Sequence, residues 1–395
     1  MSHRFLFILN NFNDVDQTAP LLFDLLERDH SVTVLCLGRF NLRADPRIAV
    51  LLNRKQFKVS TLLFLNLVVG SQSIFSKLVS ALVFNITVCR FYLKRLNISM
   101  CVYTWCNPYH KGVQTRLFKA AQSINIPNTC IPHGHNIFLN YDVNEFLTKY
   151  YKNNHKWPSF SARNQFNLYV VQTEHHRNGN IEWGLDPNTV RAWGSMRFTP
   201  SWVATHANFF PEYDGPKVKT NSVVNIVFFI PHWHYNVDTE STVHLINELA
   251  TIQYVVLAVK GHTRGDNLCK SNQDYAKLNN IDVNTPAASS TLIKWCDIVI
   301  NFGSSIGLEA IASGKPMINP SFLHRNKTVF DNNSAVLTAN NISEVLDIVK
   351  DYPTITSKVP DLDGRDKLLM TEVYANNIHI SPVDRYRVEL LKLLD

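Results

Sequence analysis

Residues 301–319, NFGSSIGLEAIASGKPMIN, combine the end of an apolar strand, a Gly-Ser-Ser turn and the start of a helix. Free backbone N–H groups and the helix dipole favour a phosphate at such a helix N-terminus. Gly303 allows close backbone approach, and Ser304 and Ser305 add hydroxyl donors. Glu309 lies one turn into the helix, where its carboxylate could accept hydrogen bonds from ribose hydroxyls. The competing interpretation is that the serines are N-caps and Glu309 a solvated acid, but the set as a whole favours a phosphate site.

Two cationic side chains, Lys260 and His262, follow a strand that is otherwise apolar, VVLAVKGH. Both would then point into the mouth of a ligand cleft rather than into the core. Lysine and histidine can neutralise a leaving phosphate without a metal ion. A solvated loop is the alternative interpretation. His232 and His234 have no Asp, Glu or Cys at convincing ligand spacing, so we expect no metal and no cofactor.

The segment IPHGHN follows another apolar run and places two histidines around Gly134. His133 is the candidate general base for an acceptor hydroxyl, and His135 with Asn136 would bind the acceptor. Asp14, which follows the first strand, is the remaining candidate for acceptor binding. Histidines held by neighbouring backbone carbonyls are the alternative interpretation.

Few other carboxylates follow the predicted strands. A centre for glycosyl transfer needs a base, or a carboxylate that stabilises or captures an oxocarbenium-like carbon. Asp238 is the first candidate, because it belongs to the same half of the chain as the phosphate-binding elements, and Glu174 is the second. The rival explanation for Asp238 is that it caps a helix beginning at Thr239, since Asp is a preferred N-cap residue.

The elements that must position these residues repeat one pattern in two halves of the chain. Apolar strands alternate with helices from residue 4 to about 200, and the pattern restarts at residue 223 after a Pro- and Gly-containing linker at 209–222. Continuous apolar strands separated by helices predict a doubly wound parallel sheet in each half, with ligands beyond the carboxyl ends of the strands. We expect domains at 1–212 and 213–378, and a final helix at 379–395 that returns to the first domain.

Composition leaves three classes of partner open. The 395 residues are 45% hydrophobic. The chain has 39 Lys and Arg residues and 32 Asp and Glu residues, which gives a net charge of +7. This surplus fits nucleic acid, an anionic membrane surface or a phosphate-bearing substrate. The basic residues are dispersed rather than gathered on one face, which argues against nucleic acid.

A membrane span is not indicated by the most apolar part of the chain. The segment at 62–93 is interrupted by Lys, Arg, Asn and Ser, so we expect a strand or loop followed by an amphipathic helix. Peripheral contact with the inner membrane face through this helix stays open, because Lys94 and Arg95 follow it. Seven scattered cysteines and the lack of a visible secretion signal favour a cytoplasmic location.

KGH followed by GSSIGLEAIASGKP in a second α/β half resembles the nucleotide-sugar site of GT-B glycosyltransferases. In bacterial members that use CMP-linked Kdo or sialic acid, a histidine and a serine pair hold the donor phosphate. The resemblance places these roles on His262 and on Ser304 with Ser305. The segment AWGSMRF at 192–198 looks like the crossover segment of surface-polysaccharide transferases, and the whole chain has their two-domain layout. Thr263 replaces the usual proline after the histidine, so UDP-sugars and CDP-glycerol remain open as substrates.

The resemblance implies a metal-independent glycosyltransferase of lipopolysaccharide O-antigen or capsule synthesis. The sequence most resembles the retaining β-Kdo transferases. This resemblance implies that the protein moves Kdo from CMP-β-Kdo onto a lipid-linked glycan. A UDP-sugar 2-epimerase and a CDP-glycerol phosphotransferase are alternatives on the same fold. A catalytically inactive GT-B module that binds a glycan or a partner protein is the alternative of another class.

Overall fold

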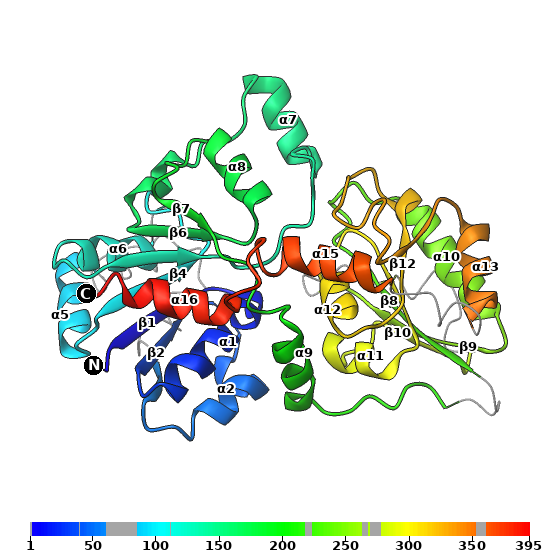
Figure 1. Cartoon of the computed structure of the whole chain (residues 1–395), viewed down its shortest axis with the longest axis horizontal. Helices are drawn as coiled ribbons and strands as arrows, with labels where there is room; N and C mark the ends of the chain where they lie inside the picture. Colours follow the sequence, from blue (N-terminus) through cyan, green and yellow to red (C-terminus); the bar gives the residue numbers. More distant parts are fainter. Residues whose placement is uncertain are drawn as a thin grey trace, which may run out of the picture. The chain divides into compact units, whose positions relative to one another are not determined.

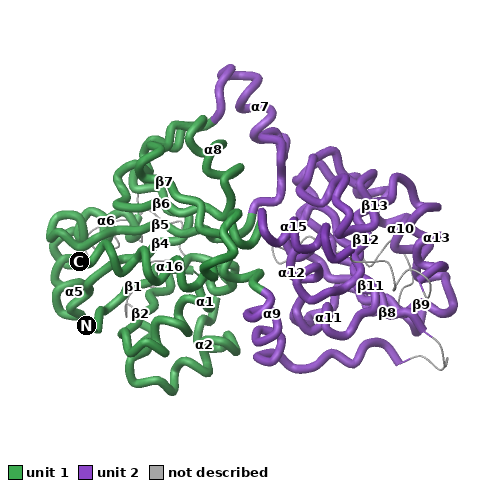
Figure 2. The backbone as a smooth tube through the Cα atoms, in the orientation of Figure 1, with its two compact units in different colours: residues 1–135, 158–199, 372–395 green, residues 136–157, 200–371 purple. Residues whose placement is uncertain are grey.

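The computed structural model describes residues 2–38, 40–60, 85–110, 112–217, 223–262, 268, 278–352 and 361–395. The chain forms two compact units, shown in Figure 2. Unit 1 contains residues 1–135, 158–199 and 372–395, and unit 2 contains residues 136–157 and 200–371. The chain therefore changes unit at residues 135, 157, 199 and 371, whereas the sequence pattern places boundaries after residues 212 and 378.

The described residues of unit 1 form a seven-stranded parallel sheet in the order β3-β2-β1-β4-β5-β6-β7. Every residue of β1 after Arg4 is buried, as expected for a central strand covered on both faces. The strands are β1 (Arg4–Leu9), β2 (Ser31–Cys36), β3 (Phe57–Ser60), β4 (Met100–Thr104), β5 (Asn128–Ile131), β6 (Leu168–Val171) and β7 (Val190–Ala192).

Helices cover both faces of this sheet (Figure 1). Phe5 and Phe7 of β1 pack into one apolar cluster with α1 and α16, while Leu6 and Ile8 pack into another with α5 and α6. This division follows from the alternation of side chains along a strand. The helices among the described residues of unit 1 are α1 (Phe12–Glu27), α2 (Pro46–Leu51), α5 (Ile86–Arg95), α6 (Val113–Gln122), α8 (Glu174–Glu182) and α16 (Pro382–Leu391).

The last helix, α16, packs against α1 in the core of unit 1. Tyr386 and Leu390 are fully or almost fully buried there, and the Tyr386 hydroxyl donates to the Gly194 carbonyl at 3.3 Å. The expected return of the C-terminal helix to the first domain is confirmed. Of the apolar segment at 62–93, residues 62–84 lie outside the described residues, and Cys89 and Leu93 are the buried residues of α5.

The described residues of unit 2 form a six-stranded parallel sheet in the order β10-β9-β8-β11-β12-β13. Its strands are β8 (Val224–Phe229), β9 (Val255–Lys260), β10 (Ile281–Val283), β11 (Ile298–Asn301), β12 (Met317–Pro320) and β13 (Leu337–Ala339). The helices of this part of the chain are α7 (Glu145–Asn154), α9 (Pro200–His206), α10 (Thr239–Thr251), α11 (Ser289–Trp295), α12 (Ile306–Ala312), α13 (Ile342–Lys350) and α15 (Leu362–Glu372), whose last residue belongs to unit 1.

Both sheets confirm the predicted doubly wound α/β architecture. In each sheet the strand order reverses at one point, between β1 and β4 in unit 1 and between β8 and β11 in unit 2. Loops at the carboxyl ends of the two strands diverge at such a point and leave a crevice for ligands. The residues after β8 and β11 are therefore the first place to look for a site in unit 2.

Candidate functional site

Loops after three neighbouring strands of unit 2 converge at the reversal point of its sheet. The imidazole of His232, after β8, lies 5.2 Å from that of His262, after β9, measured between ring centroids. Gly303, after β11, lies next to Pro231: a Cβ at Gly303 would lie 3.5 Å from the proline side chain, an ordinary contact distance. The backbone of Gly303 has φ of +63°, a conformation that favours glycine. The loop after β8 thus contacts both the predicted histidine, His262, and the predicted phosphate turn at Gly303.

The buried side-chain amide of Asn301 stabilises the turn before α12. Asn301, which is fully buried, donates from Nδ2 to the Ser304 carbonyl at 2.9 Å. The Ser304 hydroxyl accepts a long hydrogen bond of 3.5 Å from the Ile306 N–H, and Ser305 makes no side-chain cap bond within the described part of the chain. Both serines are partly exposed, so their hydroxyls are only weakly engaged in capping.

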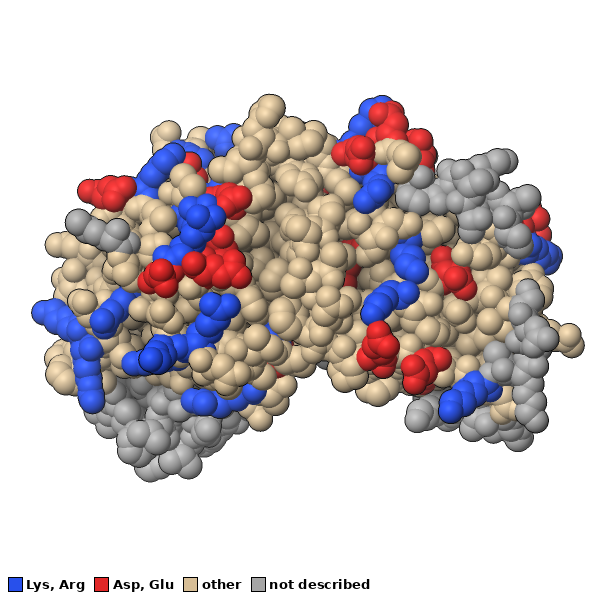
Figure 3. All heavy atoms as spheres, turned by 60° about the horizontal axis from the view of Figure 1, so that its bottom comes forward, with Lys and Arg blue, Asp and Glu red and all other residues tan. Residues whose placement is uncertain are grey.

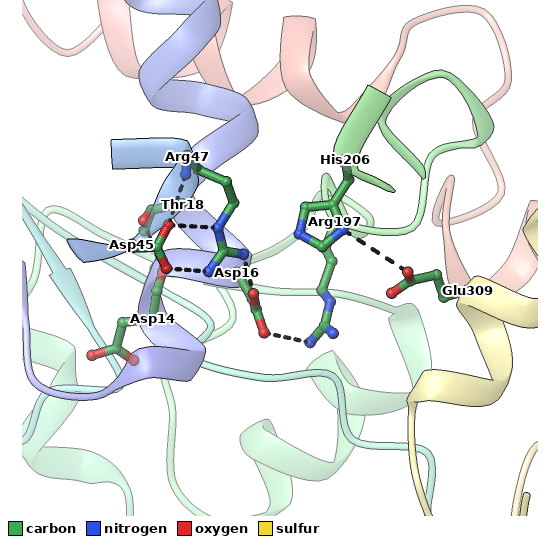
Figure 4. A network of polar contacts seen from close by, with 8 residues as sticks. All are labelled: Asp14, Asp16, Thr18, Asp45, Arg47, Arg197, His206 and Glu309. Atoms are coloured by element: carbon green, nitrogen blue, oxygen red, sulfur yellow. Dashed lines mark hydrogen bonds and ion pairs between the residues drawn. The ribbon is translucent and has the colours of Figure 1, made fainter. Parts of the chain in front are cut away.

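Glu309 is buried, with 2% of its surface exposed. Its Oε1 lies 3.9 Å from Nδ1 of His206, which α9 contributes, as Figure 4 shows. The interpretation of Glu309 as a solvated acid is therefore wrong. His206 was not a sequence-based candidate, because a single histidine near the end of a short helix carries no distinguishing signal.

Lys260 points away from bulk solvent toward the neighbouring loop. Its Nζ donates to the Thr285 carbonyl at 3.0 Å, and burial lowers the pKa of the amine. A phosphate-binding role for Lys260 stays a prediction. Residues 263–267, which follow His262, lie outside the described residues.

The two carboxylates predicted to act in catalysis are both exposed at helix N-termini. Asp238 caps α10: it accepts from the Ser241 N–H at 3.0 Å and from the Ser241 hydroxyl at 2.8 Å. These hydrogen bonds lower the pKa of the Asp238 carboxyl, so it is ionised near neutral pH. Glu174 is the first residue of α8, and its Oε2 lies 3.5 Å from Nη1 of Arg177. The N-cap explanation for Asp238 is thus realised, and a catalytic role for either carboxylate stays a prediction.

Two predicted residues of unit 1 lie in the loop after β5. The ring of His133 is partly exposed and lies 5.2 Å from that of Trp105. His135 is buried, and its Nε2 lies 3.0 Å from Oε2 of Glu372. Glu372 is far away in the sequence, so no motif links it to His135. Asn136 begins unit 2, is exposed and accepts from the Phe138 N–H at 3.1 Å.

Asp14 occupies the third position of α1 and completes a capping box with Asn11. Its Oδ2 accepts from the backbone N–H groups of Asn10 at 2.6 Å and Asn11 at 3.0 Å. Burial raises the pKa of the Asp14 carboxyl, and these hydrogen bonds act in the opposite direction. The side chain helps to shape the loop after β1, and its proposed contact with an acceptor stays a prediction.

A buried ionic network in unit 1 was not predicted (Figure 4). The guanidinium of Arg47 is fully buried and binds Asp45 through Nε at 2.9 Å and Nη2 at 2.7 Å. Arg47 also forms an ion pair with Oδ1 of Asp16. The other oxygen of that carboxylate, Oδ2, lies 3.2 Å from Nη1 of Arg197. The network joins α1, α2 and the chain after β7.

Three further observations bear on partners. No group of three or more His, Cys, Asp or Glu that could hold a metal ion occurs among the described residues. None of the described helices has the length and apolar composition needed to cross a membrane. On the face shown in Figure 3, basic and acidic side chains are interspersed.

No protein-family model matches this sequence, and a comparison with curated protein sequences finds no match either. Solved structures do match over almost the whole chain. The UDP-GlcNAc 2-epimerase from Neisseria meningitidis, bound to UDP-GlcNAc, is 14% identical with a TM-score of 0.63, over 98% of this chain and 99% of that one. A glycosyltransferase from Rickettsia africae is 15% identical with a TM-score of 0.58, over 100% and 98%.

The UDP-GlcNAc 2-epimerase from Methanocaldococcus jannaschii, in complex with UDP-GlcNAc and UDP, is also similar. It is 13% identical with a TM-score of 0.53, over 98% of this chain and 99% of that one. These similarities establish a GT-B-like fold for the chain, as the sequence resemblance implied.

Proposed function

We propose that this protein is a nucleotide-sugar enzyme of the GT-B type that transfers a glycosyl group to a glycan acceptor. The observation that carries the proposal is the convergence of His232, His262 and the Gly303 turn at the reversal point of the unit 2 sheet. Similarity to solved structures of a UDP-GlcNAc 2-epimerase and of a glycosyltransferase over at least 98% of the chain supports it.

In this proposal the donor phosphate binds at the turn formed by Gly303, Ser304 and Ser305. The partly exposed hydroxyls and the glycine backbone supply donors, and His262 adds a donor from the neighbouring loop. Glu309, one turn into α12, is the proposed partner of the ribose hydroxyls, and Lys260 contributes positive charge.

The proposed reaction breaks the bond between the anomeric carbon and the phosphate oxygen, whose electron pair leaves with the nucleotide. The acceptor hydroxyl forms the new bond to that carbon and loses its proton to a base, for which His133 is the candidate. Asp238 and Glu174 are the candidate carboxylates for stabilising positive charge at the anomeric carbon. His135, Asn136 and Asp14 are the proposed acceptor-binding residues.

Two donors are favoured by different observations. The sequence resemblance to β-Kdo transferases favours CMP-β-Kdo with retention, and a lipid-linked polysaccharide as acceptor. The solved structures with a similar fold are named for UDP-GlcNAc and UDP, which favours a UDP-sugar. Peripheral membrane contact near Lys94 and Arg95, which end α5, belongs to the lipid-linked version of the proposal.

Epimerisation at C2 of a UDP-sugar is the second candidate function. The named 2-epimerases among the similar structures favour it. Epimerisation would need acid and base groups that move a proton at C2, and His133, Asp238 and Glu174 are the candidates that are at least partly exposed.

Product analysis separates the two reactions. The protein is incubated with UDP-GlcNAc or CMP-β-Kdo, with and without a glycan acceptor, and the sugars are followed by NMR. Transfer predicts a new glycosidic signal only when the acceptor is present, and the anomeric coupling reports retention or inversion. Formation of a C2 epimer without an acceptor would show that the enzyme is an epimerase and not a transferase. No change in either sugar nucleotide would contradict both proposed functions.

A further inference from the structure

Unit 2 also contains a hollow that is lined in part by residues following His232 in the chain. It has a volume of about 500 Å³ and is formed by the loop from β8 to α10, the loop after β12 and the first residue of α7. The phosphate turn is not part of its lining. The lining residues are Glu145, Trp233, His234, Asn236, Val237, Asp238, Phe322, His324 and Arg325.

His324 is the buried polar residue of this lining, with 6% of its surface exposed. Its ring stacks on Phe302 with an interplanar angle of 10°, and its Nδ1 accepts from the Asn326 N–H at 3.1 Å. Nε2 therefore carries the ring proton, and burial lowers the pKa of the imidazole, which keeps it neutral. That buried N–H has no acceptor within the described part of the chain. A buried donor of this kind calls for an acceptor on a ligand or on water.

The walls of the pocket are held together by Asn326. Its Nδ2 donates to the carbonyls of Tyr235 at 2.9 Å and Val143 at 3.2 Å, and its Oδ1 accepts from Nδ2 of Asn236 at 2.8 Å. These bonds connect all three segments around the pocket. A ligand would therefore meet a largely preformed surface, which lowers the cost of ordering on binding.

The chemistry of the lining suits a neutral ring with many hydroxyl groups. Trp233 and Phe322 offer apolar surface, of the kind that packs against the C–H face of a sugar. Asp238 and Arg325 offer an ionised acceptor and a multiple donor near the rim, and His324 offers the inner donor. The carboxylates of Asp238 and Glu145 outnumber the single guanidinium, so a phosphate or carboxylate ligand would meet a net negative lining.

We propose that this pocket binds one uncharged sugar ring of a glycan, with a ring hydroxyl accepting the hydrogen bond from Nε2 of His324. The assignment of a glycan rests on the proposed function, in which the pocket would hold one ring of the acceptor. It gives Asp238 a binding role in addition to its cap on α10.

Saturation-transfer NMR on the whole protein tests the proposal, with methyl glycosides of glucose, galactose and N-acetylglucosamine as probes and inorganic phosphate as competitor. At least one glycoside should bind, and phosphate should not displace it. Arg325→Ala should weaken this binding about fivefold to tenfold, the loss of one good hydrogen bond. Lys327→Ala, which removes an exposed charge outside the lining, is the matched control and should bind like the wild type.

His324→Phe keeps an aromatic ring against Phe302 but removes both nitrogens, so its fold is checked by circular dichroism. If that variant does not fold, Arg325→Ala and Asp238→Asn still decide the question, because both side chains are exposed and Asn preserves the cap. Binding of no glycoside, or binding that none of these variants changes, would overturn the proposal. Phosphate binding that Arg325→Ala abolishes would overturn it in favour of an anion site.

Calorimetry with UDP and CMP on the same samples separates this proposal from the proposed function. If the wild-type protein binds a nucleotide but none of the glycosides, the pocket assignment alone would be overturned. Glycoside binding without any nucleotide binding would overturn the proposed function and leave the pocket as a glycan site.

Discussion

Nε2 of His135 lies 3.0 Å from Oε2 of Glu372, and this contact joins the loop after β5 to the residue that ends α15. Both side chains are buried in unit 1, and the His135 ring also contacts those of His176 and Phe198. The pair therefore fixes the loop that presents His133. Sequence separation hides this relationship, since the partners are 237 positions apart in the chain.

Glu372→Ala should destabilise unit 1 by about 1–3 kcal/mol, because it leaves a buried imidazole without its partner. Glu372→Gln keeps an acceptor for Nε2 and should cost less. Urea denaturation followed by circular dichroism measures both, with Glu27→Ala at an exposed helix end as control. Equal stability of Glu372→Ala and Glu27→Ala would show that the contact is not formed in solution.

Arg47→Ala should be among the most destabilising single changes, at about 3–5 kcal/mol. The substitution strands two buried carboxylates, Asp16 and Asp45, without their common counter-charge. Thermal unfolding compares it with Arg28→Ala, which removes a mostly exposed arginine 3.9 Å from Asp24 and should cost less than about 1 kcal/mol. A small effect of Arg47→Ala would contradict a buried network.

Gly303→Ala tests the proposed phosphate-binding turn directly. A residue with a side chain at φ of +63° lowers the stability of the fold by about 1–2 kcal/mol. The added methyl group would also occupy the space beside Pro231 that a phosphate would use. We expect nucleotide affinity to fall about tenfold or more. Gly314→Ala is the matched control: it has φ of +72°, and a Cβ there meets no described atom within 4 Å. It should lose similar stability but keep its nucleotide affinity.

Asp238 should make stability depend on pH through its cap on α10. Its folded pKa is lowered from 3.8 by the bonds from Ser241, so its contribution is fully present above about 3.8 and is lost as pH falls through the lower folded value. Asp238→Ala should therefore be less stable than wild type by about 1 kcal/mol at pH 6. Melting temperatures from pH 6 to pH 3 should converge for the two proteins. A difference that does not shrink with acid would mean that the charged carboxylate does not cap the helix.

The fold could be predicted because its strands are buried on both faces. Runs such as Phe5–Leu9 are uniformly apolar, and helical spacing between them leaves a parallel sheet as the consistent arrangement. The position of Gly303 at a strand end followed from the same pattern. The capping role of Asp238 was also visible, since its acid directly precedes a helix.

The remaining parts of the site depend on tertiary contacts that no spacing reveals. Arg47 and Asp16 lie 31 residues apart in the sequence. Glu372 and His324 belong to no motif that the sequence analysis identified. The direction of Lys260 toward Thr285 depends on the loop after β10, which a strand pattern does not specify. Burial of Glu309 likewise results from the packing of α12 against its neighbours.

Isothermal titration of the purified protein with UDP, CMP and CDP tests the central claim most directly. A nucleotide site in unit 2 predicts saturable binding of one of these nucleotides, weakened about tenfold or more in both His262→Ala and Gly303→Ala and retained in Gly314→Ala. Preference for CMP would support the Kdo donor, and preference for UDP a UDP-sugar. Failure to bind any of the three nucleotides, in a sample with native circular dichroism, would contradict the account.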